Sequence, residues 1–120
     1  MGLDTNGHGH RPYSEKYLNN IKLVDLGLKR VEAILDNFYN DNMTSFILTA
    51  DHGMSNRGTH GDGDPANTET PIIVWGAGIA SANKTLPNNH KIDSLEWGLE
   101  SVQRNDIDQA DIAPLMVFDN

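Results

Sequence analysis

Two glycine-rich segments of this sequence combine aspartate with histidine. In the first, LDTNGHGH, Asp4 stands four positions before His8. The second, TADHGMSNRGTHGDGD, contains the neighbours Asp51 and His52 and, further along, His60. Carboxylate oxygens and neutral imidazole nitrogens together suit Zn²⁺, and also Mn²⁺ or, less well, other divalent ions. A metal site is therefore one interpretation of the two segments.

The spacing alone leaves a second interpretation open. Aspartate beside glycine is common in turns, where its carboxylate binds backbone N–H groups without any metal. Asp51 and His52 are adjacent, so in an extended chain their side chains point in opposite directions. A turn could bring both toward one ion, or they could serve different sides of a site. Ligands collect beyond the carboxyl ends of strands in open α/β sheets, so the apolar run before Asp51 favours a site there.

A long amphipathic helix is predicted over residues 14–39. Its apolar residues recur at alternating steps of four and three, which is typical of one stripe along a helix. The stripe consists of Tyr17, Ile21, Val24, Leu28, Val31, Leu35 and Phe38. Ser14 is a suitable N-cap with Glu15 in the first turn, and the sequence NDN at 40–42 is expected to end the helix.

The other elements are predicted to be strands, loops and a final helix. Residues 45–50 and 71–78 are predicted strands, whose nearly continuous apolar runs are typical of strands covered on both faces. Residues 1–12 are expected to be loop. Residues 80–106 are expected to be irregular, with a short helix around SLEWGLESV, and DQADIAPLMVF to begin a last helix near Asp108 or Asp111. The pattern predicts an α/β fold, with part of a doubly wound sheet covered by the long helix.

Composition excludes some classes of function. The 120 residues are about the size of one domain, and the net charge of −8 argues against nucleic acid as a partner, because a phosphate backbone requires a cationic surface. No cysteine is present, which removes disulfides and thiolate metal sites. No apolar run reaches the roughly 20 residues of a membrane span, and the start does not read as a signal peptide. We expect residues 1–120 to be a single partial domain of a longer protein.

Three short motifs carry a resemblance to a known family. DTNGH, TADHGM and THGDG resemble the metal-binding segments of the alkaline phosphatase superfamily. The longer run ending in NTETPIIVWGAG is similar to one branch, the GPI ethanolamine phosphate transferases. The resemblance implies an α/β fold with a partial alkaline-phosphatase-like sheet and covering helices. It also implies that the chain is the C-terminal part of a phosphoethanolamine transferase domain.

The resemblance implies a site for two divalent metal ions, expected to be zinc, with manganese as the alternative. Asp4, His8 and His60 would hold one ion, and Asp51 and His52 would help to hold the other. The family's nucleophilic threonine and one further aspartate are expected on a segment upstream of this chain. Residues Thr5, Thr49 and Thr59 do not match the nucleophile position, so no catalytic residue is assigned.

The activity implied by the resemblance is a metal-dependent transfer reaction. Phosphoethanolamine would pass from phosphatidylethanolamine, through a covalent phosphothreonine, to a mannose of the GPI glycolipid precursor. Such an enzyme would act on the luminal side of the endoplasmic reticulum membrane and be held there by segments absent from this chain. Two alternatives stay open: a truncated, metal-binding but non-catalytic fragment or pseudoenzyme, and a soluble phosphodiesterase of the same superfamily. An upstream Thr or Ser after a strand would favour catalysis.

A few residues near the motifs have weaker interpretations. Asp62 and Asp64 could orient His60 or attract an ethanolamine ammonium, or they could be turn residues. Residues 67–70 are expected to form a turn leading into a strand. His10 and His90 are not expected to be ligands. Glycines that would permit the tight backbone of such loops stand at positions 7, 9, 53, 58, 61 and 63.

Overall fold

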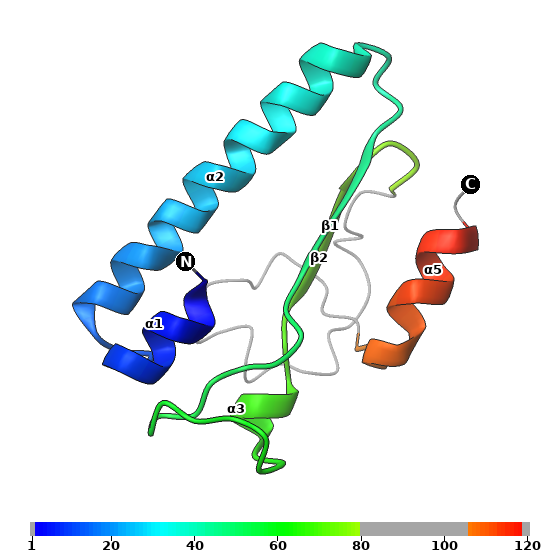
Figure 1. The fold of residues 1–120 in the computed structure, drawn as a ribbon. Helices are drawn as coiled ribbons and strands as arrows, with labels where there is room; N and C mark the ends of the chain where they lie inside the picture. The colour runs from blue at the N-terminus through cyan, green and yellow to red at the C-terminus, as the bar shows by residue number, and fades with distance from the viewer. Residues whose placement is uncertain (1, 80–105, 119–120) are drawn as a thin grey trace, which may run out of the picture. The chain divides into compact units, whose positions relative to one another are not determined.

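A computed structural model describes residues 2–79 and 106–118 of the chain (Figure 1). The chain divides into two compact units, Met1–Ile79 and Ala80–Asn120. The first unit contains the helices α1 (Leu3–His10), α2 (Glu15–Tyr39) and α3 (Pro65–Thr68) and the strands β1 (Ser45–Thr49) and β2 (Ile72–Gly76). The mixture of helices and strands agrees with the predicted α/β class.

The second unit contributes a short 3₁₀ turn, Gln109–Asp111, followed by α5 (Ile112–Phe118). Asp108 is the N-cap residue of that turn, so the predicted helix start near Asp108 is confirmed. The helix predicted around SLEWGLESV, and His90, lie outside the described residues.

Helix α2 begins and ends where the sequence predicts. The Ser14 hydroxyl accepts a hydrogen bond from the backbone N–H of Tyr17 at 3.1 Å, which is the N-cap interaction expected of serine. Asn40, with φ 48°, takes the left-handed conformation at the C-terminal end, and its N–H donates to the carbonyl of Asp36 at 2.9 Å. Left-handed residues at this position are a common way to end a helix.

The packed face of α2 is rotated from the predicted stripe. Tyr17, Val24, Leu28 and Leu35 are half-buried, as predicted, but Ile21, Val31 and Phe38 are 42%, 53% and 77% exposed. Glu32 is half-buried instead of Val31, because its carboxylate accepts a hydrogen bond of 2.8 Å from the indole Nε1 of Trp75. The polar contact between Glu32 and the sheet therefore partly buries Glu32 at the point where the apolar pattern predicts that Val31 is buried.

The expectation that residues 1–12 form a loop is wrong, since residues 3–10 form α1. The helix packs against α2, and Asp4 in its first turn stabilises the helix N-terminus. Gly7, an unfavourable residue for a helix, is buried there, and a Cβ on it would lie 2.8 Å from the Met54 Cε. Tertiary packing against the neighbouring loop therefore overrides the weak local helix preference.

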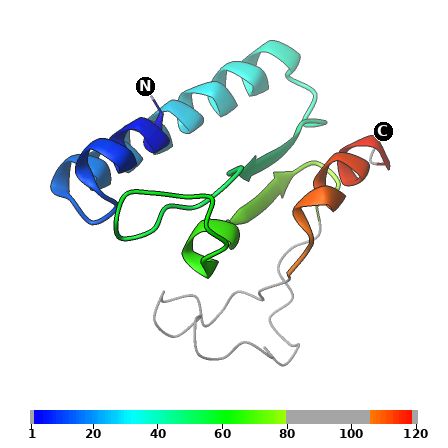
Figure 2. The same ribbon diagram turned by 60° about the horizontal axis from the view of Figure 1, so that its bottom comes forward.

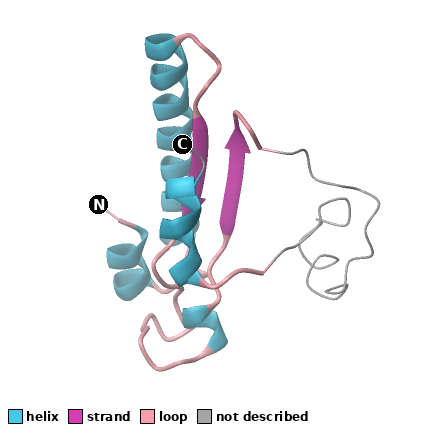
Figure 3. Cartoon of the chain, turned by 90° about the vertical axis from the view of Figure 1, so that its right-hand side faces the viewer, coloured by secondary structure: helices cyan, strands magenta, loops and turns pink. Residues whose placement is uncertain are grey.

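Strands β1 and β2 pair antiparallel, with Ser45 opposite Gly76 and Thr49 opposite Ile72 (Figure 3). The two predicted strands are confirmed, but they are not covered on both faces in the described structure, since Ile73 is 54% exposed. The antiparallel pairing places the carboxyl end of β1 beside the start of β2. The segment joining them runs from β1 out to α1 and returns through α3 (Figure 2).

The described residues contain no fully buried hydrophobic side chain, and many large apolar side chains of α2 are exposed. Among these residues, Leu23, Ile34 and Phe38 are 66%, 65% and 77% exposed. Within the described ranges, no helix combines the length and apolar character needed to cross a membrane.

Candidate metal centre

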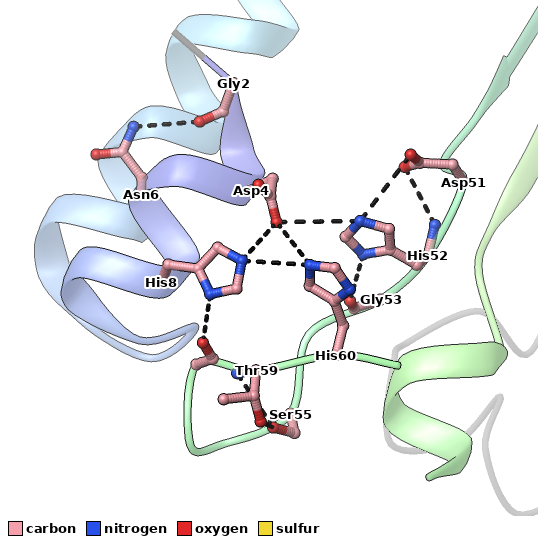
Figure 4. Close-up of polar contacts among 11 residues, drawn as sticks. Gly2, Asp4, Asn6, His8, Asp51, His52, Gly53, Ser55, Thr59 and His60 are labelled. Carbon is pink, nitrogen blue, oxygen red and sulfur yellow. Dashed lines mark hydrogen bonds and ion pairs between the residues drawn. The ribbon is translucent and has the colours of Figure 1, made fainter. Parts of the chain in front are cut away.

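One carboxylate and three imidazoles converge where α1 meets the segment that follows β1 (Figure 4). We refer to Asp4, His8, His52 and His60 as the histidine cluster. The Asp4 Oδ1 lies 3.2 Å from the His8 Nε2, 3.4 Å from the His60 Nε2 and 3.9 Å from the His52 Nε2. The structure thus brings together residues from both predicted motif segments.

Helix α1 explains how Asp4 and His8 reach the same point. Residues four apart lie on one face of an α-helix, so the two side chains project together from α1. The ligand-type atoms of Asp4, His8 and His60 all lie within 4.8 Å of one another. This is the group of three that the resemblance assigned to one ion.

A backbone carbonyl fixes the ring of His8. The His8 Nδ1 lies 2.7 Å from the carbonyl oxygen of Gly58, and a carbonyl oxygen can only accept, so Nδ1 carries the proton. The neutral ring then presents an unprotonated Nε2 to its neighbours. That atom lies 3.2 Å from the His60 Nε2 as well as close to the carboxylate of Asp4.

The chemistry of these donor atoms fits a divalent cation. Two ring nitrogens and one carboxylate oxygen face a common point, and a single proton on His60 can bridge only one of its two neighbours. A cation at that point would satisfy all three atoms together. Histidines that bind metal ordinarily donate their other ring N–H to a carbonyl or carboxylate, as His8 does to Gly58.

His52 and Asp51 lie at the edge of the same centre. The His52 Nδ1 is 2.9 Å from the carbonyl of Gly53, so in the neutral ring the free lone pair lies on Nε2, which is 3.9 Å from both the Asp4 Oδ1 and the Asp51 Oδ2. Asp51 is 91% exposed, and its other oxygen accepts a hydrogen bond from the His52 N–H at 3.1 Å. The turn after β1 therefore brings these neighbours to one side, as one of the two interpretations expected.

The rings of His52 and His60 are stacked, with centroids 3.7 Å apart and an interplanar angle of 18°. Behind them, the N–H of Gly53 donates to the carbonyl of Asn67 at 2.8 Å. A Cβ on Gly53 would lie only 2.0 Å from the carbonyl oxygen of Ala66, so the close contact between this turn and α3 requires glycine.

Asp62 and Asp64 make turn and cap contacts and none with His60. The Asp64 carboxylate accepts from the N–H of Ala66 at 2.9 Å and caps α3. Asp62 accepts hydrogen bonds from the backbone N–H of Asp64 and from the Asn67 side chain, and these, in that order, hold the pKa of Asp62 below its ordinary value. The turn interpretation of both aspartates is the one the geometry favours.

His10 is exposed at the C-terminal end of α1, outside the histidine cluster. None of the three threonines considered as hydroxyls belongs to the histidine cluster, and the Thr59 hydroxyl is hydrogen-bonded to the Ser55 hydroxyl at 3.0 Å. The sequence did not point to two groups beside the histidine cluster, the Gly58 carbonyl that contacts His8 and the Ser55 hydroxyl that contacts Thr59. A short-range motif signals side-chain chemistry, and neither a backbone carbonyl nor a lone serine gives such a signal.

The sequence of the chain matches a known family. The family described as Sulfatase matches over residues 4–116. No solved structure shows a significant match to the chain. The family match confirms the resemblance inferred from the short motifs.

The curated relatives share one description, GPI ethanolamine phosphate transferase 1. The relative from Aspergillus oryzae is 53% identical over 98% of this chain and 12% of its own length. The relative from Mus musculus is 49% identical over 97% of this chain and 13% of its own length. The relative from Yarrowia lipolytica is 48% identical over 98% of this chain and 13% of its own length. The chain therefore spans about an eighth of these relatives.

Proposed function

Because the chain belongs to the sulfatase family, we propose that it supplies metal ligands to an enzyme that transfers phosphoethanolamine to the GPI-anchor precursor. Relatives that share about half of its residues carry the description GPI ethanolamine phosphate transferase 1. In this proposal phosphatidylethanolamine is the donor and a mannose of the GPI glycolipid is the acceptor, at the endoplasmic reticulum membrane. The rest of the catalytic apparatus, including the nucleophile, lies on other parts of such a protein.

The observation that carries the proposal is the convergence of Asp4, His8 and His60 on one point, with the Nδ1 of His8 turned away from it to the Gly58 carbonyl. An exposed pair of charged residues is common and would mean little. Here the three residues come from two segments far apart in sequence, and the orientation of one ring is set by a backbone carbonyl. These features support a site for a cation.

Each residue has a defined task in the proposed site. Asp4, His8 and His60 would hold one divalent ion, zinc or alternatively manganese, and Asp51 and His52 would help to hold the second. Asp4 offsets part of the positive charge, and the Nδ1 hydrogen bonds of His8 and His52 keep each Nε2 available as a ligand. Bound divalent ions supply positive charge to phosphoryl oxygens and lower the pKa of a nearby hydroxyl.

Metal content tests the proposal. The chain is loaded with zinc, dialysed, and its bound metal counted by elemental analysis beside a His52→Ala, His60→Ala double variant. We expect zinc in the parent and its loss from the variant. A matched His10→Ala change, on the same helix as His8 but outside the cluster, should leave the zinc content unchanged.

The zinc affinities of single variants give a second, quantitative test. Loss of an outer partner of a ligand costs about 10- to 100-fold in metal affinity, so loss of His60 itself should cost more than about 100-fold. Equal affinities for the His60→Ala and His10→Ala variants would refute the ligand assignment. Retention of zinc by the double variant would do the same.

A further inference from the structure

Ser55 is one of two polar side chains that are buried in the described structure, being only 8% exposed. Its hydroxyl lies 3.0 Å from the hydroxyl of Thr59 and accepts a weaker hydrogen bond from the Thr59 N–H at 3.4 Å. The backbone repeats the pairing, because the Ser55 N–H donates to the Thr59 carbonyl at 3.0 Å. A fourth bond, from the Gly58 N–H to the Ser55 carbonyl at 2.9 Å, closes the turn. Residues 55–59 thus form a tightly closed loop, which we call the Ser55–Thr59 turn.

The turn contributes to the histidine cluster at two places. Its Gly58 carbonyl is the group that accepts from the His8 Nδ1 at 2.7 Å. The residue immediately after the turn is His60, whose Nε2 lies 3.2 Å from the His8 Nε2. One loop conformation therefore sets both the ring orientation of His8 and the position of its partner His60.

The turn is seated firmly against α1. Gly58 is buried with φ +76°, a conformation that side-chain-bearing residues rarely adopt, and a Cβ there would lie 2.9 Å from the carbonyl oxygen of Gly7. A small displacement of the turn would move the Gly58 carbonyl away from His8. The hydroxyl pair is the side-chain interaction that closes this turn.

We propose that Ser55 and Thr59 are positioning residues of the metal centre, whose paired hydroxyls hold His8 in its Nδ1-protonated form and place His60 beside it. Neither hydroxyl is proposed as a metal ligand or as a nucleophile. The inference rests on the proposed metal site for its functional meaning. Its structural part, control of the His8 ring by the turn, is independent of any bound ion.

Thr59→Val is the primary test, because Thr59 is exposed and valine has nearly the same shape without the hydroxyl. In the metal-free full chain, at a pH where imidazole is neutral, long-range ¹H–¹⁵N spectra report which nitrogen of His8 carries the proton. We expect the parent to show mainly Nδ1-protonated His8, and Thr59→Val to show a mixture of both forms. Zinc affinity should fall about 10- to 100-fold in Thr59→Val, as for other outer partners of ligands.

Two matched variants separate positioning from general loosening of the loop. Thr59→Ser keeps the hydroxyl and should restore both the His8 spectrum and the zinc affinity. Asn56→Ala, at an exposed position of the same turn, should change neither. Ser55→Ala should reproduce Thr59→Val, and its far-ultraviolet circular dichroism checks that α2 is retained.

The outcomes distinguish this inference from the proposed function. A parent chain that binds no zinc but shows Nδ1-protonated His8, lost in Thr59→Val and restored in Thr59→Ser, would refute the metal site and support the positioning by the turn. A parent that binds zinc while Thr59→Val and Thr59→Ser have the same affinity and the same His8 spectrum would refute the positioning role alone.

Discussion

The indole Nε1 of Trp75 donates a 2.8 Å hydrogen bond to the carboxylate of Glu32, which joins strand β2 to helix α2. Both residues are half-buried, and the Trp75 ring also stacks on Phe46 with centroids 5.2 Å apart. This polar contact connects the long helix, against which α1 packs, to the sheet whose strand β1 leads into the segment carrying His52 and His60.

Replacing Glu32 by Ala should therefore weaken the attachment of α2 to the sheet. The indole N–H would lose a charged acceptor in a partly buried place, which costs about 1–2 kcal/mol of unfolding free energy. Urea unfolding followed by circular dichroism measures the change. Glu32→Gln keeps an acceptor oxygen and should lose much less; an unchanged free energy of unfolding in Glu32→Ala would show that the contact contributes no stability.

Alanine should be harmful at Gly53, where it should lower the zinc affinity, and favourable at Gly27, where it should raise the stability of the chain. Gly53→Ala places a Cβ 2.0 Å from the carbonyl oxygen of Ala66, so the turn that carries His52 must move and zinc affinity should fall. Gly27 lies inside α2 with nothing within 4 Å of its Cβ position, and Gly27→Ala should stabilise the chain by up to about 1 kcal/mol. Zinc titration and thermal unfolding of both variants give the comparison, and unchanged zinc affinity in Gly53→Ala would contradict it.

The carboxyl group of Asp62 should titrate below the ordinary aspartate value of 3.8, because the Asp64 N–H and the Asn67 side chain stabilise its ionised form. A depressed pKa in the folded state contributes stability above pH 3.8 that is lost as the pH falls through the folded value. Asn67→Ala removes the second of these causes, so the Asp62 pKa should rise and the acid-side loss should begin at higher pH. Carboxyl ¹³C titration of the metal-free chain measures this directly.

Asn56→Ala is the matched control for the Asp62 titration, since Asn56 is exposed in the neighbouring turn. It should leave the Asp62 titration where the parent has it. If Asn67→Ala leaves the Asp62 pKa unmoved as well, the side-chain hydrogen bond from Asn67 does not act on Asp62 in solution.

The sequence was most informative where local interactions decide the structure. The Ser14 cap, the length of α2 and the two strands follow from periodicity and turn residues within a few positions. It was least informative where distant segments compete with local preference. One example is α1, where the glycines predict a loop but Gly7 packs against Met54 within a helix. The other is Glu32, whose burial depends on its hydrogen bond with Trp75.

The candidate site shows the same division. The family resemblance implied that Asp4, His8, Asp51, His52 and His60 serve one metal centre, and the structure brings these side chains near one another. The groups that set the His8 ring and hold the loop were not predictable. Every residue has a backbone carbonyl, so the sequence does not reveal which carbonyl will accept from His8. The contact of the Ser55 hydroxyl with Thr59 depends on a turn geometry that no residue pattern specifies.

The contact between His8 and His60 spans 52 positions of the chain. Bringing two such distant points together in an otherwise flexible polypeptide costs roughly 3–4 kcal/mol of chain entropy, by the logarithmic dependence on loop length. An ion shared by these side chains would act as a reversible cross-link, comparable in topology to a disulfide in a sequence that has no cysteine. Metal supply would then govern how tightly the first helix is fastened to the rest of its unit, as well as the chemistry at the centre.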